Sequence, residues 1–206
     1  MQGVYIPFWL YSGNCEGSIT AEGINTRTWT SGNYRYTEKK YYSVYRNGTL
    51  DFKAVPVDAS SKTDDDAMDS IEPFDYSEMT AFNPGYLSGY LAERYDEDKD
   101  KCLPRAKERI ENTTRDELRN TCNYNSVNVQ SYEKHTEIKD VKYAMLPTWL
   151  LYTTYQDKPY FFAMNGQAVK FIGNLPISKG KLVAYSLLGG VGGYIIGAIL
   201  QIMGIF

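Results

Sequence analysis

The densest cluster of reactive side chains is an acidic stretch, residues 57–76 (VDASSKTDDDAMDSIEPFDY). Carboxylates at this density can hold a hard cation such as calcium or magnesium, which prefers several oxygen ligands. They can equally begin a helix, because carboxylates in a first turn interact favourably with the helix dipole. We favour the structural role. The next alternative is a contact surface for a basic partner, formed by Asp58, Asp64, Asp65, Asp66, Asp69 and Glu72.

A second acidic group fails the pattern of a calcium-binding loop. Asp96, Asp98 and Asp100 match its first three ligand positions. However, Lys101 stands where the sharp turn requires glycine, and Lys107 stands where a bidentate glutamate is needed. We interpret this group as a charged turn before a helix, and we predict no metal site and no cofactor.

Candidates for nucleophilic catalysis are few. The only histidine is His135, in a polar stretch between two predicted strands, and the three cysteines, Cys15, Cys102 and Cys122, form no C-x-x-C pair. A Cys–His pair stays open, but no G-x-S-x-G, H-E-x-x-H or Walker sequence is present. The odd number and wide spacing of the cysteines argue against a disulfide framework and a zinc site, and favour packing roles in a reducing compartment. We predict no catalytic residue, so the chain is not expected to be an enzyme.

The charge balance argues against direct binding of nucleic acid. The chain has 22 Lys and Arg against 25 Asp and Glu, a net charge of −3. Because non-specific affinity for nucleic acid comes from neutralising phosphates, a chain without a broad basic field is not expected to bind it.

The elements that position these residues indicate an α+β fold, with antiparallel β-meander blocks flanking a central helical region. Alternating apolar and polar residues predict strand blocks over 4–57 and 126–173, around helices within 63–122. Within the first block the predicted strands are 4–11, 19–24, 26–30, 34–46 and 49–57. Hairpin turns are expected at 31–33, at Asn47-Gly48, at 156–158 and at Asn165-Gly166. The predicted helices are 63–71, 83–95 and about 100–122.

The C-terminal stretch predicts a transmembrane helix. Residues 182–206 contain no charged side chain, and a helix of this length is long enough to cross a hydrocarbon core of about 30 Å. We therefore expect a soluble domain over 1–178 and an anchor over 179–206. Because Lys170, Lys179 and Lys181 precede the span, the domain is expected to face the cytoplasm from a single-pass position in the cell membrane. Gly189, Gly193 and Gly197 would line one helix face and predict homo-oligomers.

Several segments together resemble a family of bacterial zinc-ribbon-containing membrane proteins. The resemblance rests on residues 4–11 (VYIPFWLY), 56–76, 86–95 (YLSGYLAERY), 104–110 (PRAKERI) and 162–176 (FAMNGQAVKFIGNLP). It implies one or two C-x-x-C zinc ribbons ahead of a β-rich domain and a hydrophobic C-terminal segment. Some members carry a label taken from the replication-restart helicase. This chain lacks the zinc ribbon and any nucleotide-binding loop, so no zinc ligand or helicase residue is carried over.

Three hypotheses for function follow. The leading one is a non-enzymatic, membrane-anchored scaffold that contacts the lipid bilayer and an unidentified protein partner. The first alternative is a nucleic-acid-associated protein whose binding resides in a missing zinc ribbon. The second is a metal-dependent enzyme or metal-binding module that uses the acidic segment 58–75.

Overall fold

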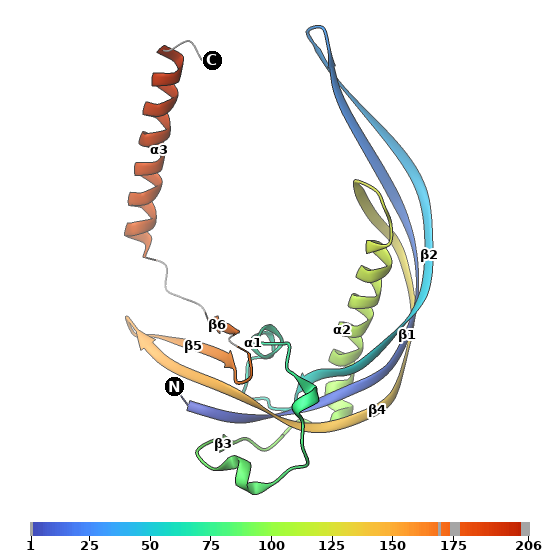
Figure 1. Ribbon diagram of the computed structural model, residues 1–206, viewed down its shortest axis with the longest axis vertical. Helices are drawn as coiled ribbons and strands as arrows, with labels where there is room; N and C mark the ends of the chain where they lie inside the picture. Colours follow the sequence, from blue (N-terminus) through green and yellow to red (C-terminus); the bar gives the residue numbers. More distant parts are fainter. Residues whose placement is uncertain (1, 169, 174–177, 203–206) are drawn as a thin grey trace.

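A single antiparallel sheet organises the chain. The computed structural model describes residues 2–168, 170–173 and 178–202 (Figure 1). The sheet has the strand order β2-β1-β4-β5-β6, and a short β3 pairs in parallel with β1. The strands are β1 (Gln2–Ser31), β2 (Tyr34–Asp58), β3 (Leu91–Ala92), β4 (Ser126–Tyr155), β5 (Lys158–Asn165) and β6 (Phe171–Gly173).

The expectation of separate strand blocks flanking a helical region is wrong. The pairing of β1 with β2 runs from Phe8, which lies opposite Asp58, to the turn. The pairing of β1 with β4 runs from Gln2, opposite Leu150, to Ile24, opposite Ser126. Pairing between residues more than a hundred positions apart therefore joins both predicted blocks into one curled sheet, and the fold is mostly β. The short strands predicted within residues 4–57 are continuous in the structure, where they form the two long strands β1 and β2.

The chain also forms helices, and some of them pack on this sheet. The helices are α1 (Asp65–Ser70), α2 (Lys99–Asn120), α3 (Lys179–Ile202), and the short 3₁₀ helices η1 (Tyr76–Glu78) and η2 (Pro84–Leu87). In Figure 1, α2 lies along the concave side of the curled sheet. The buried residues of α2 recur every four positions, which places them on one helix face; they are Cys102, Ala106, Ile110, Thr114 and Leu118.

Backbone conformation and strand pairing together decide which predicted turns and helices form. The helix expected over 83–95 is wrong, because Gly89 adopts a φ of 86° and the chain leaves η2 for the extended β3. Asn47-Gly48 is not a hairpin either, since both residues pair with β1 inside β2. The turn at 156–158 is confirmed. Gln156 and Asp157 have φ values of 51° and 58°, which a type I′ turn requires.

The number of faces of β1 that pack against other elements decreases in three zones along its length. In residues 4–11, Ile6 and Phe8 pack against α1, while Tyr11 on the opposite face packs against α2. Further along, Ile19 and its neighbours face α2, and the other face of the strand is open. In residues 26–31 every residue is exposed. Strand alternation sends successive side chains to opposite faces, so β1 is covered on two faces, then one, then none.

The predicted transmembrane anchor over 179–206 is wrong. Among the residues that the structure describes, no helix combines the length and apolar character needed to cross a membrane. The expected single-pass position in the cell membrane, with a domain facing the cytoplasm, rested on that span and falls with it. The stretch 203–206 of the expected anchor lies outside the described residues.

The close contact of β1 with β4 generates a stability prediction at Gly13. A Cβ at this position would lie 2.0 Å from the backbone carbonyl oxygen of Glu137. We expect Gly13→Ala to lower the free energy of unfolding by about 1–3 kcal/mol, because the backbone must shift to admit the methyl group. Urea denaturation followed by circular dichroism measures this loss.

Gly48→Ala is the matched control in the neighbouring strand. Its Cβ would meet only the Cδ2 of Leu118, at an ordinary contact distance of 3.4 Å. A Gly13→Ala protein as stable as Gly48→Ala would contradict the close packing described for β1 and β4.

Candidate functional site

The acidic segment is joined to α2 by two arginines. The Nη1 of Arg105 lies 2.7 Å from Asp58 and 2.9 Å from Asp65, and its Nη2 lies 2.6 Å from Asp69. One helical turn later, Arg109 contacts Asp69 at 3.1 Å and Glu72 at 2.8 Å. Arg109 also donates to the backbone carbonyl of Pro56 in β2. These contacts form one network between α1 and α2.

Asp58 is the innermost member of this network. Its side chain is 1% exposed, accepts a hydrogen bond of 2.9 Å from the Thr63 hydroxyl, and accepts a second from Arg105. Burial raises the pKa of Asp58 above its usual value, although the hydrogen bond and charge of Arg105 act to lower it. Glu72 follows the same pattern, with burial raising its pKa and Arg109 opposing that rise. Burying these carboxyl groups therefore depends on the two guanidinium groups.

The predicted contact surface divides into carboxylates that contact an arginine of α2 and carboxylates that do not. Asp58, Asp65, Asp69 and Glu72 all contact an arginine of α2. Asp64 caps α1 by accepting from the backbone N–H of Ala67, while Asp64 and Asp66 are exposed. The segment thus serves mainly to dock α1. Among the described residues, no group of three or more His, Cys, Asp or Glu side chains could hold a metal ion.

The calcium-like triplet also has structural partners. Asp98 is the N-cap of α2 and accepts from the backbone N–H of Lys101. Asp96 accepts from both the backbone and the hydroxyl of Ser61. The interpretation as a charged turn before a helix is confirmed.

The cysteines and the histidine do not meet. Cys15 accepts a hydrogen bond from Thr136, which also contacts Glu111 of α2, so this thiol is on the face covered by α2. His135 is the neighbour of Thr136 in β4, so it points to the opposite face, where it is exposed. All three cysteines are free and buried. Burial, with the nearby charges of Glu97 and Asp58, raises the pKa of the Cys102 thiol to about 11. A thiolate paired with imidazole is therefore not formed.

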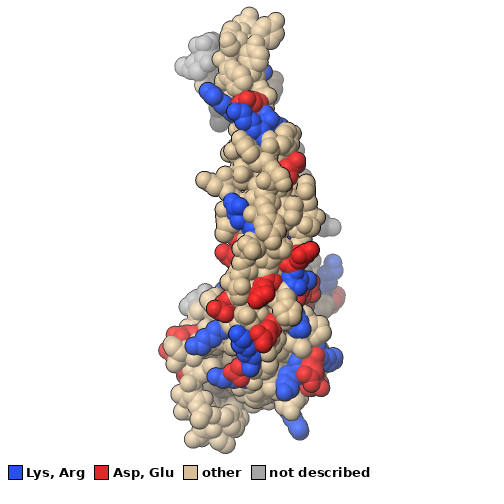
Figure 2. Space-filling model, turned by 90° about the vertical axis from the view of Figure 1, so that its right-hand side faces the viewer, with Lys and Arg blue, Asp and Glu red and all other residues tan. Residues whose placement is uncertain are grey.

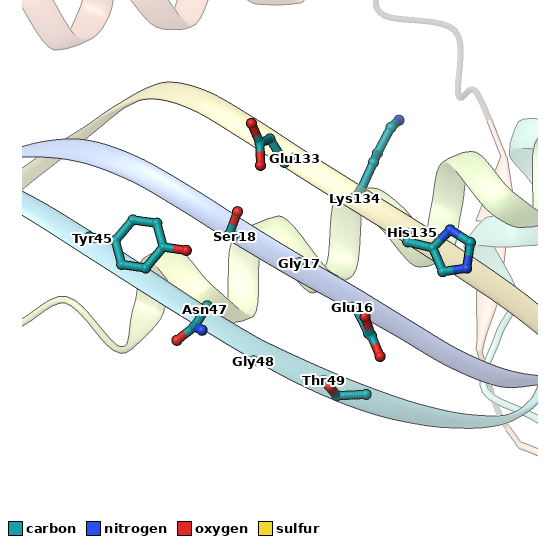
Figure 3. Close-up of a pocket in the computed structure, with 10 residues that line it drawn as sticks. All are labelled: Glu16, Gly17, Ser18, Tyr45, Asn47, Gly48, Thr49, Glu133, Lys134 and His135. Atoms are coloured by element: carbon teal, nitrogen blue, oxygen red, sulfur yellow. The ribbon is translucent and has the colours of Figure 1, made fainter.

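His135 borders a shallow depression of about 420 Å³ on the open face of the sheet. Figure 3 shows its lining side chains spread along β1, β2 and β4 rather than converging on one point. The polar side chains that line it are Glu16, Ser18, Tyr45, Asn47, Thr49, Glu133, Lys134 and His135. Catalysis needs groups aimed at a common reacting atom in a site that limits water, and this open arrangement offers neither.

A projecting part of the β1–β2 hairpin, which the sequence did not single out, is the most distinctive surface. We call residues 25–42 the ribbon arm. Pairing of β1 with β4 stops at Ile24 and Ser126, so beyond that point only two strands continue to the turn at Gly32. Figure 1 shows this pair projecting past α2 and the end of β4.

The ribbon arm concentrates positive charge in an acidic chain. Its cationic side chains are Arg27, Arg35, Lys39 and Lys40, and its one carboxylate is Glu38. Four cations against one carboxylate give +3, which leaves −6 for the rest of a chain whose net charge is −3. On the face that Figure 2 shows, few acidic side chains lie in the upper half, whereas side chains of both signs crowd the lower half. The whole-chain balance conceals this local field; a charge count over short windows would have found it.

Exposed aromatic rings accompany these charges. Trp29 and Tyr36 stack across the two strands with ring centroids 5.6 Å apart, and the guanidinium of Arg27 lies 5.7 Å from the Trp29 ring. Trp29 stays 42% exposed and Tyr34, beside the turn, 71%. A large aromatic surface left in water is typical of a contact site.

Comparison with known proteins identifies one homologue by name. The chain is a homologue of the uncharacterized protein YdjG of Bacillus subtilis (strain 168), to which it is 38% identical over 184 residues. The match covers 89% of this chain and 54% of YdjG, so the chain spans about half the length of that curated relative. No protein-family model matches the chain. No solved structure matches it at significant similarity. The name of YdjG states no activity, so the homology transfers no functional residue.

The arginine network generates a prediction about stability. Replacing Arg105 by methionine would leave the carboxylate of Asp58 buried without its counter-ion. We expect Arg105→Met to lower the free energy of unfolding by about 3–5 kcal/mol. The double variant Arg105→Met/Asp58→Asn should recover much of this loss, because the buried charge is removed together with its partner. Chemical denaturation of the single and double variants measures both effects.

Lys101→Met provides the control on the same helix. Lys101 pairs with Glu97 at 2.7 Å, but its side chain is 64% exposed, so its loss should cost less than about 1 kcal/mol. If Arg105→Met were no more destabilising than Lys101→Met, the arginine network would not be a main support of the fold.

Proposed function

We propose that this domain is a non-enzymatic interaction module that binds its partner through the ribbon arm. The observation that carries the proposal is that the arm continues beyond the third strand of the sheet with both faces exposed. An isolated two-stranded ribbon is at best marginally stable in water. A ribbon with exposed aromatic rings would gain protection for its backbone and its apolar surface when a partner covers it.

The arrangement of the remaining reactive groups supports a binding role over a catalytic one. The buried and partly buried carboxylates of the acidic segment already form ion pairs with Arg105 and Arg109. The thiols are buried on one side of the sheet, and His135 is on the other. Asp64 and Asp66 are exposed and form a secondary candidate contact for a basic partner.

Two finer expectations stay proposals. Membership of the zinc-ribbon-containing family rests on the shared sequence segments alone.

Self-association through α3 rests on Gly189, Gly193 and Gly197, where an added Cβ would meet no atom within 4 Å. If Gly193→Ile left chemical cross-linking between copies unchanged, this glycine face would not be an interface.

Site-specific photo-crosslinking in cells that express the chain tests the arm as a binding surface. A photoreactive phenylalanine derivative replaces Tyr34 in the arm or, as the matched control, Tyr152 near the β4–β5 turn; these side chains are 71% and 65% exposed. We expect several-fold more adduct from position 34, because a partner covers the arm. Equal yields from the two positions would contradict the proposal.

A shortened chain provides the second control. Asn25 and Lys40 are register partners, so a two-residue Asn-Gly turn can replace residues 26–39 without disturbing the rest of β1 and β2. This variant should keep the melting temperature of the body within a few degrees and lose the interaction. Retained binding would place the contact elsewhere on the domain.

A further inference from the structure

We propose that the ribbon arm binds double-stranded DNA by lying in its major groove, an inference that rests on the proposed function of the arm. The first reason is charge. The arm carries +3, whereas the rest of the chain carries −6. Phosphates attract the arm and repel the body, so this charge distribution favours contact through the arm alone.

The positions of the cations distinguish a groove from a flat anionic surface. Val44 is buried on the side of α2, and strand alternation places Lys40 on that same face and Arg35 and Lys39 on the other. Arg27 shares the α2-side face with Trp29, whose ring it approaches. The arm therefore carries two cations on each face, and on the α2-side face Glu38 pairs with Lys40 at 3.6 Å and lies opposite Arg27. A ribbon in a groove has a phosphate backbone on either side, whereas a membrane or a flat acidic protein surface meets one face only.

The dimensions of the arm fit the groove. A two-stranded β ribbon is one of the elements that the B-DNA major groove, about 12 Å wide, admits. Seven residues, 25–31, span about 24 Å at roughly 3.4 Å per residue. DNA rises by about 3.4 Å per base pair, so the arm can follow about seven base pairs before the turn.

One face of the arm is rich in hydroxyl groups. Thr28 and Thr37 face each other across the two strands, with their Oγ1 atoms 3.4 Å apart. Thr26 and Thr30 follow on the same face of β1, because they are two residues away from Thr28. Hydroxyl groups donate to and accept from both phosphates and base edges. The face opposite the Trp29 and Tyr36 rings therefore carries hydroxyl groups beside Arg35 and Lys39, and these groups can contact one of the two phosphate backbones.

The salt dependence of DNA binding tests this inference. The full chain is titrated into a fluorescent DNA duplex of mixed sequence at 50 to 200 mM NaCl, with anisotropy as the readout. If all four cations neutralise phosphates, the slope of log K against log salt should be about −3.6, which is roughly a 100-fold loss of affinity over this range. The variant Arg27→Gln/Arg35→Gln/Lys39→Gln/Lys40→Gln should lose this binding.

The matched control removes the same charge from the body. Lys53, Lys99, Lys139 and Lys158 are exposed outside the arm, and their replacement by glutamine should leave binding within about two-fold, since these residues do not contact phosphate in the proposed complex. Equal weakening by both quadruple variants would overturn the inference, because it would show a general charge effect. Thermal melting of both variants verifies that the body is folded.

Other ligands serve as competing outcomes. The inference would be overturned if the chain did not bind the DNA duplex at 50 mM NaCl, or if it bound vesicles that contain anionic lipid in place of DNA. A preference for duplex RNA would also overturn it, because the major groove of RNA is too narrow for side chains. The adducts formed at position 34 separate this failure from failure of the proposed function. Adducts that nucleases remove support DNA. Adducts that only proteases remove would keep the interaction module and refute the DNA ligand.

Discussion

The structure depends on two guanidinium groups that reach around the edge of a sheet. β2 is an edge strand, with α1 packed on one face of the neighbouring β1 and α2 on the other. Arg105 and Arg109 extend from α2 to the carboxylates of α1 and its flanking segments. A sheet edge exposes unpaired backbone groups, and here an arginine also satisfies the carbonyl of Pro56 in that edge. The ion pairs therefore fasten two layers that the sheet itself separates.

These ion pairs hold α1 and α2 at one end of the long strands, and the packing of helices on both faces of the sheet is therefore concentrated there. Where α1 and α2 enclose the sheet, β1 is buried on both faces and supplies most of the apolar core. α2 ends at Asn120 and β4 begins at Ser126, so neither continues alongside the hairpin. The ribbon arm is what remains of β1 and β2 beyond their supports. Its charge and aromatic rings are then displayed on a narrow projection instead of a broad face.

The sequence predicted local features better than their assembly. Residues 4–11 as a strand, 63–71 and 100–122 as helical regions, and the turn at 156–158 all follow from nearby residues, and the structure contains each of them. Pairing of β1 with β4 depends on contacts across more than a hundred residues, which periodicity does not encode. Asn47-Gly48 shows the conflict clearly, since a strong turn signal is overridden when both neighbours are held in register by β1. The acidic segment was recognised, but its partners Arg105 and Arg109 were not, because only the fold brings α2 beside it.

The early end of β4 also affects how the molecule moves. Residues 27–30 keep backbone hydrogen bonds to one neighbouring strand only, whereas residues 8–11 are paired on both sides and packed on both faces. The free energy needed to open a backbone hydrogen bond follows local packing, so it decreases along one continuous strand. The hairpin can separate from its tip downward while the body stays intact. Amide protons near Gly32 should thus exchange with solvent through local fraying, and those beside Phe8 only when the whole domain unfolds.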